Sequence, residues 1–373
     1  MKQSPASSMY SYGLLDRWLH EAAFSTTGLQ CAVADIEQRL FASSLRRIQV
    51  DRPVFIASLP RCGTTLLLEL LCGTGEFAAH SYVDMPFVLN PMLWSFLTRR
   101  HRKQVRNIER AHGDGVLINF ESPEGFEEIV WRAIGPERRD GAALKEWTDA
   151  DLTPQGRVFL VNHLRKILAL RGGAQGARRY LSKNNANIAR IDLLGGIFPD
   201  CTILVPFRAP VEQASSIERQ HRRFTDIQRG DRFALDYMKY LGHLEFGDLF
   251  TPFVFGLRGE CRESSQYGSL ACWVSYWSAI YAYLLGKADS RIVFLDFDEL
   301  RRRPEASLVA LASRLKLAQV ENLTKQSHWV LAREAGLGDP VYVSRAGDLT
   351  FANSTYDALK ARAINRGSSA ELD

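Results

Sequence analysis

The chain has 373 residues, of which 46% are hydrophobic and 24% are charged, and its formal net charge at neutral pH is +5. This length can bury a sizeable core, while the weak positive charge favours an anionic ligand without arguing for nucleic acid. No unbroken apolar run is long enough to span a membrane, and the amino-terminal residues lack the apolar segment of a secretory signal, so we expect a cytoplasmic protein.

Strands and helices alternate along the chain. Residues 1–50 have apolar residues at helical spacing. The stretch VFIASLPRCGTTLLLELL, residues 54–71, then predicts a buried strand, a turn at Pro60 and an apolar helix. Two more strands, at 201–207 and 291–297, are each followed by a helix. This alternation predicts an α/β fold with a central parallel β-sheet flanked by helices.

Long stretches between these units are expected to be helical insertions, at residues 92–112, 156–170 and 268–286. The basic run at 99–112 fits either a solvated helix face or a wall for an acidic substrate. Because no linker, repeat or low-complexity block divides the chain, we expect a single domain. Its parts would be an N-terminal helical segment (1–50), a core (51–317) and a C-terminal segment (318–373).

Six cysteines are scattered through the sequence without a CxxC pair. Most have apolar neighbours, which is typical of buried thiols. We therefore expect no metal site and no disulfide framework.

The turn after the first strand is suited to a phosphate group. A loop that leaves a strand and opens a helix directs backbone N–H groups and the positive end of the helix dipole at one point. Gly63 allows close approach to the backbone, Thr64 and Thr65 add hydroxyl donors, and Arg61 adds a forked positive charge. A nucleoside-triphosphate loop would need GxxxxGK[ST], and both the first glycine and the lysine are missing.

The segment LPRCGTTLLLELL resembles the 5′-phosphosulfate loop of the sulfotransferase family, in which Pro, Arg or Lys, Ser, Gly and Thr precede an apolar helix. Cys62 stands where that family usually has Ser, which removes a hydroxyl but leaves the backbone N–H. The resemblance implies the P-loop-like sulfotransferase fold and the donor 3′-phosphoadenosine 5′-phosphosulfate (PAPS).

Two later segments are similar to the same family, in the same order. VPFRAPVEQASSIERQH supplies Arg208 and, eight residues later, Ser216, which match the family's contacts to the donor's 3′-phosphate. Both are hydrogen-bond donors, as a phosphate dianion requires. The segment 291–317 resembles a structural strand and helix near the family's carboxyl end. The resemblance thus runs from about residue 53 to residue 317.

The resemblance also implies catalytic residues. Lys183 matches a lysine that reaches the transferring sulfuryl group, although Asn185 and Ala186 replace the usual Asp-Pro. For the general base we expect Asp84, with His80 as the second candidate and Glu121 or Glu124 as further ones. Asp84 fits a capping residue equally well. Ser344 and Arg345 are candidate contacts in a closing loop.

The sequence therefore predicts a PAPS-dependent sulfotransferase that acts on a hydroxyl of a small molecule, glycan or peptide, without a metal, a nucleic-acid partner or a membrane span. The alternatives are a nucleoside or small-molecule kinase with a degenerate phosphate loop, and a nucleotide-binding scaffold without catalysis. The sequence leaves the acceptor and the oligomeric state open.

Overall fold

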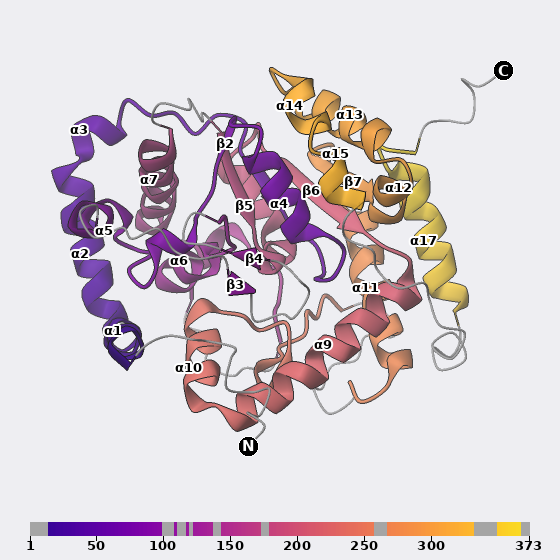
Figure 1. The fold of residues 1–373 in the computed structure, drawn as a ribbon, viewed down its shortest axis with the longest axis horizontal. Coiled ribbons are helices and arrows are strands. Elements are labelled where there is room, and N and C mark those ends of the chain that lie inside the picture. Colours follow the sequence, from indigo (N-terminus) through magenta and orange to yellow (C-terminus); the bar gives the residue numbers. More distant parts are fainter. Residues whose placement is uncertain are drawn as a thin grey trace.

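The computed structural model describes residues 14–98, 108–109, 117–118, 122–136, 143–172, 179–256, 267–331 and 349–366. Its centre is a five-stranded parallel sheet in the order β2-β5-β1-β6-β7 (Figure 1). The strands are β1 (Val54–Ile56), β2 (Phe77–Ala78), β5 (Arg179–Lys183), β6 (Thr202–Phe207) and β7 (Ile292–Asp296). The predicted α/β class with a parallel sheet is confirmed.

Helices lie on both faces and at both ends of this sheet (Figure 1). The α-helices are α1 (Leu14–Ser25), α2 (Thr27–Leu40), α3 (Ala42–Leu45), α4 (Thr64–Cys72), α5 (Pro91–Thr98), α6 (Glu127–Ile134), α7 (Pro154–Arg171), α8 (Ile191–Ile197), α9 (Pro210–Gly230), α10 (Arg232–Leu241), α11 (Leu270–Gly286), α12 (Phe297–Arg302), α13 (Pro304–Leu315), α14 (Val320–Thr324), α15 (Ser327–Leu331) and α17 (Thr350–Arg362). Short 3₁₀ helices are η2 (Tyr82–Asp84), η3 (Asp149–Asp151), η4 (Asn185–Arg190) and η5 (Gly247–Leu249). Within the described part of the chain, no helix is both apolar enough and long enough to cross a bilayer.

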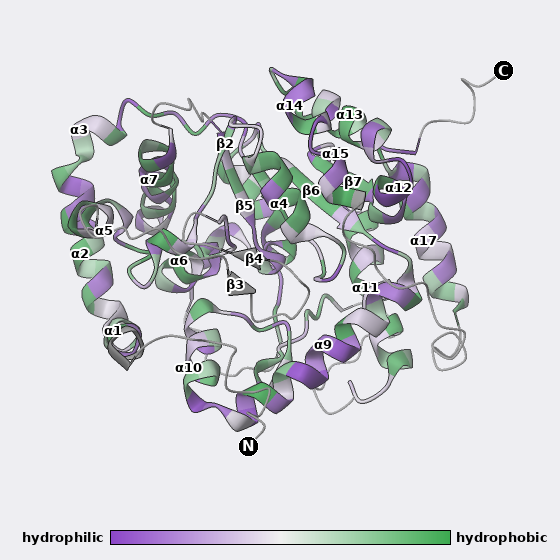
Figure 2. Cartoon of the chain, in the orientation of Figure 1, coloured by the Kyte–Doolittle hydropathy of each residue, from purple (hydrophilic) through white to green (hydrophobic). Residues whose placement is uncertain are grey.

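The two faces of the sheet bury different sets of side chains. Val54 and Ile56 of β1 pack with leucines of α4 and α13, while Phe55 between them packs on the opposite face with α7, α8 and α11. This alternation is the two-residue period of a strand, and because helices cover both faces the strands β1, β6 and β7 are buried throughout. Figure 2 shows hydrophobic strands at the centre and a more hydrophilic α9 at the periphery.

The predicted insertions differ from the structure in two places. The helix expected over residues 92–112 ends at Thr98 in α5, and residues 108–109 form strand β3 (Ile108–Glu109), which pairs with β4 (Leu117–Ile118). The helical prediction is therefore wrong at 108–109. The stretches at 156–170 and 268–286 are helical, as α7 and α11.

Cysteine chemistry also differs from the expectation at one position. Cys31, Cys62, Cys72 and Cys201 are free thiols, as predicted. Cys272, in the first turn of α11, takes part in a disulfide bond whose partner lies outside the described residues. Cys272 is thus not the free buried thiol that the sequence analysis expected.

Candidate functional site

The loop between β1 and α4, residues 57–63, which we call the phosphate loop, contains two residues with a positive φ angle. Gly63 caps α4 with a left-handed φ of 82°, and a Cβ at this position would lie 2.1 Å from the Phe297 ring. Arg61 has a φ of 71°, which is rare for a residue with a side chain and stores local strain. The loop therefore opens directly onto the unpaired N–H groups at the start of α4.

The side chain of Cys62 packs inside the loop. It is fully buried, and its Sγ donates to the carbonyl of Leu59 at 3.0 Å and to the hydroxyl of Ser58 at 3.4 Å. Burial raises the pKa of the thiol to about 11, so it is neutral. The exchange of Ser for Cys changes the inside of the loop and leaves its ligand-facing backbone intact.

The two predicted anion-binding segments meet in the structure. The Nε atom of Arg61, in the phosphate loop, donates to the Oγ atom of Ser216, on α9, at 3.1 Å. These residues are 155 positions apart in sequence. Parallel pairing of β1 with β6 brings them together, because the carboxyl ends of adjacent parallel strands lie at the same edge of the sheet.

Arg208 follows β6 at this same edge. Its side chain is only 10% exposed, and its Nε atom lies 3.2 Å from Oδ1 of Asp298. The other oxygen of Asp298 accepts from the backbone N–H of Ala209 at 2.8 Å. Asp298 comes just after β7, in the segment 291–317 that resembles the sulfotransferase family. This segment therefore positions Arg208, which belongs to another segment with the same resemblance.

Gln213, which the sequence analysis missed, connects both segments. It lies on α9 and is fully buried. Its Nε2 donates to the carbonyls of Leu59 at 3.3 Å and Pro60 at 2.9 Å, and its Oε1 accepts from the backbone N–H of Arg208 at 3.2 Å. Two side chains of α11 also donate to Oε1. One amide thus fixes the phosphate loop relative to Arg208.

Replacing Gln213 with leucine should loosen this connection. Each buried group left without a partner costs about 1 to 3 kcal/mol, so we expect lower stability together with weaker anion binding, on the order of tenfold. Gln228→Leu is the matched control, because Gln228 is also buried on α9 but bonds to Met238, Phe246 and Asp248 instead of the loop. Urea unfolding measures the stability of each variant. Calorimetry with adenosine 3′,5′-bisphosphate, the nucleotide that PAPS becomes when it loses its sulfuryl group, measures the anion affinity. Equal anion affinity in the two variants would contradict this role of Gln213.

Lys183 is the last residue of β5 and is aligned with Ile56 of β1. Neighbouring strands lie about 4.8 Å apart, so the backbone of Lys183 lies beside the end of β1, where the phosphate loop begins. Its Nζ atom lies 3.9 Å from Oε1 of Glu124, and a Cβ at Gly125 would lie 2.3 Å from the carbonyl oxygen of Lys183. The turn at 124–125 therefore packs directly on the end of β5.

Asp84 and His80, the first two candidates for the base, belong to a buried cluster. Oδ1 of Asp84 accepts from Arg171 at 2.6 Å, and Oδ2 lies 3.3 Å from Nδ1 of His80 and accepts from the backbone N–H of Ser81 at 3.0 Å. Burial alone would raise the pKa of Asp84, but the hydrogen bond with His80 and the charge of Arg171 outweigh it, and the pKa is lowered. Ser81 and Asp84 also form a capping box around η2.

His163 of α7 completes this cluster. Its ring stacks on His80, and the two Nε2 atoms are 3.3 Å apart. Burial lowers the pKa of His163 well below 6.5, and the neighbouring His80 and Lys166 act in the same direction. His163 is therefore neutral in the folded protein.

Acidification should destabilise the fold through His163. Below pH 6.5 the unfolded chain binds a proton that the folded chain does not, so stability falls with falling pH, by up to about 1.4 kcal/mol per unit. His163→Gln should make this dependence shallower in urea unfolding between about pH 7.5 and pH 5.5. His328→Gln is the control, because His328 is exposed. An unchanged pH dependence in His163→Gln would contradict the assignment.

Of the remaining candidates, Glu124 is 7% exposed, and its carboxylate accepts from the hydroxyl of Tyr82 and from the backbone N–H of Gly125, both at 2.8 Å. Glu121, Ser344 and Arg345 lie outside the described residues.

Thr64 and Thr65 occupy the first turn of α4, with Thr64 buried. Among the described side chains, no group of His, Cys, Asp and Glu is arranged to hold a metal ion.

Several known proteins are similar to this chain, all at low identity. The crystal structure of sulfotransferase STF1 from Mycobacterium tuberculosis H37Rv is 15% identical, with 87% of this chain and 80% of that chain covered and a TM-score of 0.42. Sulfotransferase STF9 from Mycobacterium avium is 12% identical, with 86% and 79% covered and a TM-score of 0.49. A sulfotransferase from Alicyclobacillus acidocaldarius is 16% identical, with 86% and 99% covered and a TM-score of 0.41. No curated protein matches the chain.

The model of the sulfotransferase family matches residues 53–243. This range contains the phosphate loop, Lys183, Arg208 and Ser216, and it spans just over half of the 373 residues. The chain belongs to the sulfotransferase family.

Proposed function

We propose that this sulfotransferase takes its sulfuryl group from PAPS and transfers it to an acceptor hydroxyl by in-line displacement. The observation that carries the proposal is the 3.1 Å hydrogen bond between Arg61 and Ser216, because it joins two anion-binding segments into one site. A nucleotide with phosphate groups on both its 3′ and its 5′ oxygens is the ligand that such a site fits.

The residues present fit this donor. A side chain at position 63 would clash with the ring of Phe297, so the loop requires its glycine. In our proposal this loop, with Thr64 and Thr65, binds the 5′-phosphate, while Arg208 and Ser216 bind the 3′-phosphate. Since Asp298 already fixes Nε of Arg208, the guanidinium is oriented before the donor arrives.

The protein contributes charge and position to the transfer. PAPS supplies the activated sulfuryl group. Arg61 and Lys183 would stabilise the negative charge that develops on the sulfuryl and bridging oxygens, as cations do in phosphoryl transfer. The sequence analysis named Asp84 and His80 as candidates for the general base. Their buried bonds to Arg171 and His163 favour a role in positioning the segment before Pro86, and we propose that role for them.

Calorimetry with two matched nucleotides tests the donor site. Adenosine 3′,5′-bisphosphate should bind at least about tenfold more tightly than adenosine 5′-phosphate, because hydrogen bonds to a charged group contribute about 1.5 to 3 kcal/mol each. Equal binding of the two nucleotides would contradict the 3′-phosphate site. Turnover of ATP with Mg²⁺, without binding of the bisphosphate, would favour the kinase alternative.

A further inference from the structure

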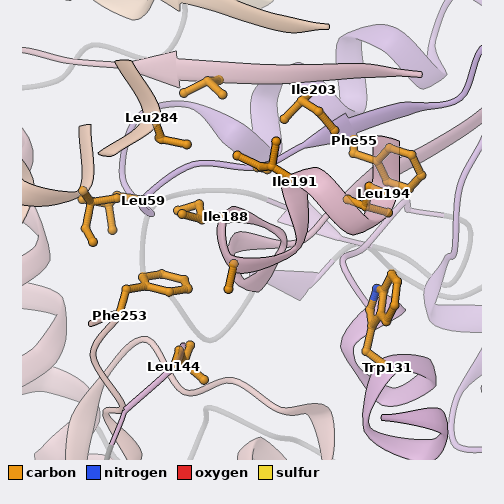
Figure 3. Close-up of a cluster of buried hydrophobic side chains, with 14 of the residues drawn as sticks. Phe55, Leu59, Trp131, Leu144, Ile188, Ile191, Leu194, Ile203, Phe253 and Leu284 are labelled. Atoms are coloured by element: carbon orange, nitrogen blue, oxygen red, sulfur yellow. The ribbon is translucent and has the colours of Figure 1, made fainter. Parts of the chain in front are cut away.

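The end of strand β5 is fixed beside the phosphate loop. The backbone N–H of Asn184, the residue after Lys183, donates to the carbonyl of Ile56 at 3.1 Å, so the pairing of β5 with β1 continues past Lys183. Figure 3 shows Ile188, a little further along the chain, in one cluster of buried side chains with Leu59 of the phosphate loop. The backbone of Lys183 therefore has a defined position relative to the loop.

The carboxylate of Glu124 lies next to the ammonium group of Lys183. Its Oε1 is 3.9 Å from Nζ of Lys183 and accepts from the backbone N–H of Gly125 at 2.8 Å. Its Oε2 accepts from the hydroxyl of Tyr82, also at 2.8 Å. Two charge-assisted hydrogen bonds of about 2.8 Å span a gap of up to about 5.6 Å, so one reacting group can contact both the ammonium and the carboxylate.

The backbone around Glu124 is anchored to the segment that follows β2. The N–H of Glu124 donates to the carbonyl of His80 at 2.9 Å, and the N–H of Tyr82 donates to the carbonyl of Ser122 at 3.3 Å. The side chain of His80 is in turn held by Asp84 and the rest of its buried cluster. This cluster thus positions Glu124 as well as the segment before Pro86.

The strand order gives the donor a direction along this edge of the sheet. In the proposed donor site the 3′-phosphate lies at Arg208, after β6, and the 5′-phosphate lies at the loop after β1. The next strands in the same direction are β5, which ends at Lys183, and β2, which Tyr82 follows. In-line displacement requires the acceptor on the far side of sulfur from the bridging oxygen. In this arrangement the acceptor oxygen arrives from the side of β5 and β2, where Glu124 lies.

Asp84 is less suited to accept the acceptor's proton. It is 2% exposed, and its Oδ1 accepts from the guanidinium of Arg171 at 2.6 Å. So short a bond to a cation makes a carboxylate a weaker proton acceptor. Glu124 accepts from a neutral hydroxyl and a neutral amide, and the ammonium of Lys183 is 3.9 Å away.

On the basis of the PAPS-dependent activity proposed above, we propose that Glu124 is the general base and that the acceptor binds over the ends of β5 and β2. The acceptor oxygen attacks sulfur as its proton passes to the carboxylate of Glu124. The new bond joins the acceptor oxygen to sulfur, and the bond between sulfur and the bridging oxygen breaks. The electron pair of that bond remains on the 5′-phosphate of the nucleotide.

Calorimetry with two nucleotides tests whether Glu124 faces the sulfuryl group. Glu124→Gln should bind PAPS about threefold to tenfold more tightly than the wild-type chain, because it removes a negative charge beside the anionic sulfuryl group and releases Lys183 from its ion pair. The affinity for adenosine 3′,5′-bisphosphate, which has no sulfuryl group, should stay within about twofold. Equal changes in the two affinities, or no change in either, would overturn this placement of Glu124.

Glu146→Gln is the matched control for these affinities. Glu146 is also paired with a lysine, Lys287, but it lies on the exposed surface. The variant removes the same charge and should leave both affinities unchanged, since salt screens exposed charges. Failure of the wild-type chain to bind the bisphosphate would contradict the donor site itself, and with it this inference.

Two phenols test the proton transfer, in the full chain with PAPS as donor. 4-Methylphenol keeps its proton at neutral pH, whereas 4-nitrophenol ionises near neutral pH and needs little help from a base. Glu124→Gln should lower kcat for 4-methylphenol by about 10²-fold to 10⁴-fold, and for 4-nitrophenol by less than about tenfold. Equal losses for the two phenols, or the selective loss in Asp84→Asn instead, would overturn the assignment of the base.

A second variant disturbs the carboxylate of Glu124 without removing it. Tyr82→Phe deletes the hydroxyl that donates to Oε2 of Glu124. It should lower kcat for 4-methylphenol by about tenfold, less than Glu124→Gln does, and leave 4-nitrophenol nearly unaffected, because only the orientation of the base changes. A larger selective loss in Tyr82→Phe than in Glu124→Gln would assign the proton transfer to Tyr82 and overturn the role of Glu124.

Discussion

Replacing Arg208 with alanine should weaken binding of adenosine 3′,5′-bisphosphate by about 2 to 3 kcal/mol, or roughly 30-fold to 150-fold. The side chain of Arg208 is 90% buried and is held by Asp298, so in the proposed donor site it would meet the phosphate desolvated and already oriented. Arg208→Lys should recover only part of the affinity, because lysine keeps the charge but lacks the planar fork. Calorimetry at one fixed ionic strength gives these affinities.

Arg222→Ala is the control for Arg208→Ala. Arg222 lies on the same α9 helix, but its side chain is 60% exposed and pairs with Glu218. Removing it changes the net charge equally and should change the affinity little, since exposed charges are screened by salt. Unchanged affinity in Arg208→Ala, or equal losses in the two variants, would remove Arg208 from the donor site.

Replacing Glu128 with alanine should lower the free energy of unfolding by about 3 to 5 kcal/mol, a large part of the stability of a typical domain. Both oxygens of Glu128 accept from the guanidinium of Arg190, at 2.6 and 2.9 Å. Arg190 is fully buried, with its guanidinium 4.8 Å from the ring of Trp131 and 4.4 Å from that of Trp147. Without Glu128 this buried charge loses the carboxylate with which it forms its ion pair.

Urea unfolding measures the effect of Glu128→Ala. Asp236→Ala, which breaks the exposed pair with Arg232, should cost less than about 1 kcal/mol and serves as the control. The double variant Glu128→Leu, Arg190→Met should be more stable than Glu128→Ala, because it removes both charges. A loss below about 1 kcal/mol in Glu128→Ala would show that the pair does not stabilise the core.

The sequence was sufficient to predict the strand, turn and helix around residues 57–63, because every requirement there is local. A buried strand, a glycine with a positive φ and the start of a helix are adjacent in sequence. The same holds for Arg208 and Ser216, since eight residues of turn and helix set their separation. Patterns of this kind depend on backbone geometry that neighbouring residues determine.

Strand β5 illustrates where such patterns fail. Its sequence RYLSK has a single aliphatic residue and charged ends, so it does not resemble a buried strand. Arg179 is nevertheless buried, and its guanidinium donates to carbonyl oxygens of Arg52 and Leu315. These partners are 127 and 136 positions away in sequence. No local rule could predict them.

The sequence analysis also failed to identify buried polar side chains that form tertiary hydrogen bonds. A glutamine in a charged helix resembles a solvated residue, yet Gln213 is fully buried because α9 packs beside the phosphate loop. The capping interpretation of Asp84 was available from the local sequence, whereas the hydrogen bond from Arg171, 87 positions away, is a tertiary contact that no local pattern predicts.

By itself, the sequence determined the α/β class, the strand and helix on either side of residues 57–63, and the family, because these depend on backbone conformation and on the order of motifs. Only the tertiary structure decided which side chains share one site. The strand order places the ends of β5, β1, β6 and β7 next to one another, although their residues are up to about 240 positions apart. Burial and neighbouring charges, which lower the pKa of Asp84 and give Gln213 its hydrogen-bond partners, exist only after that assembly.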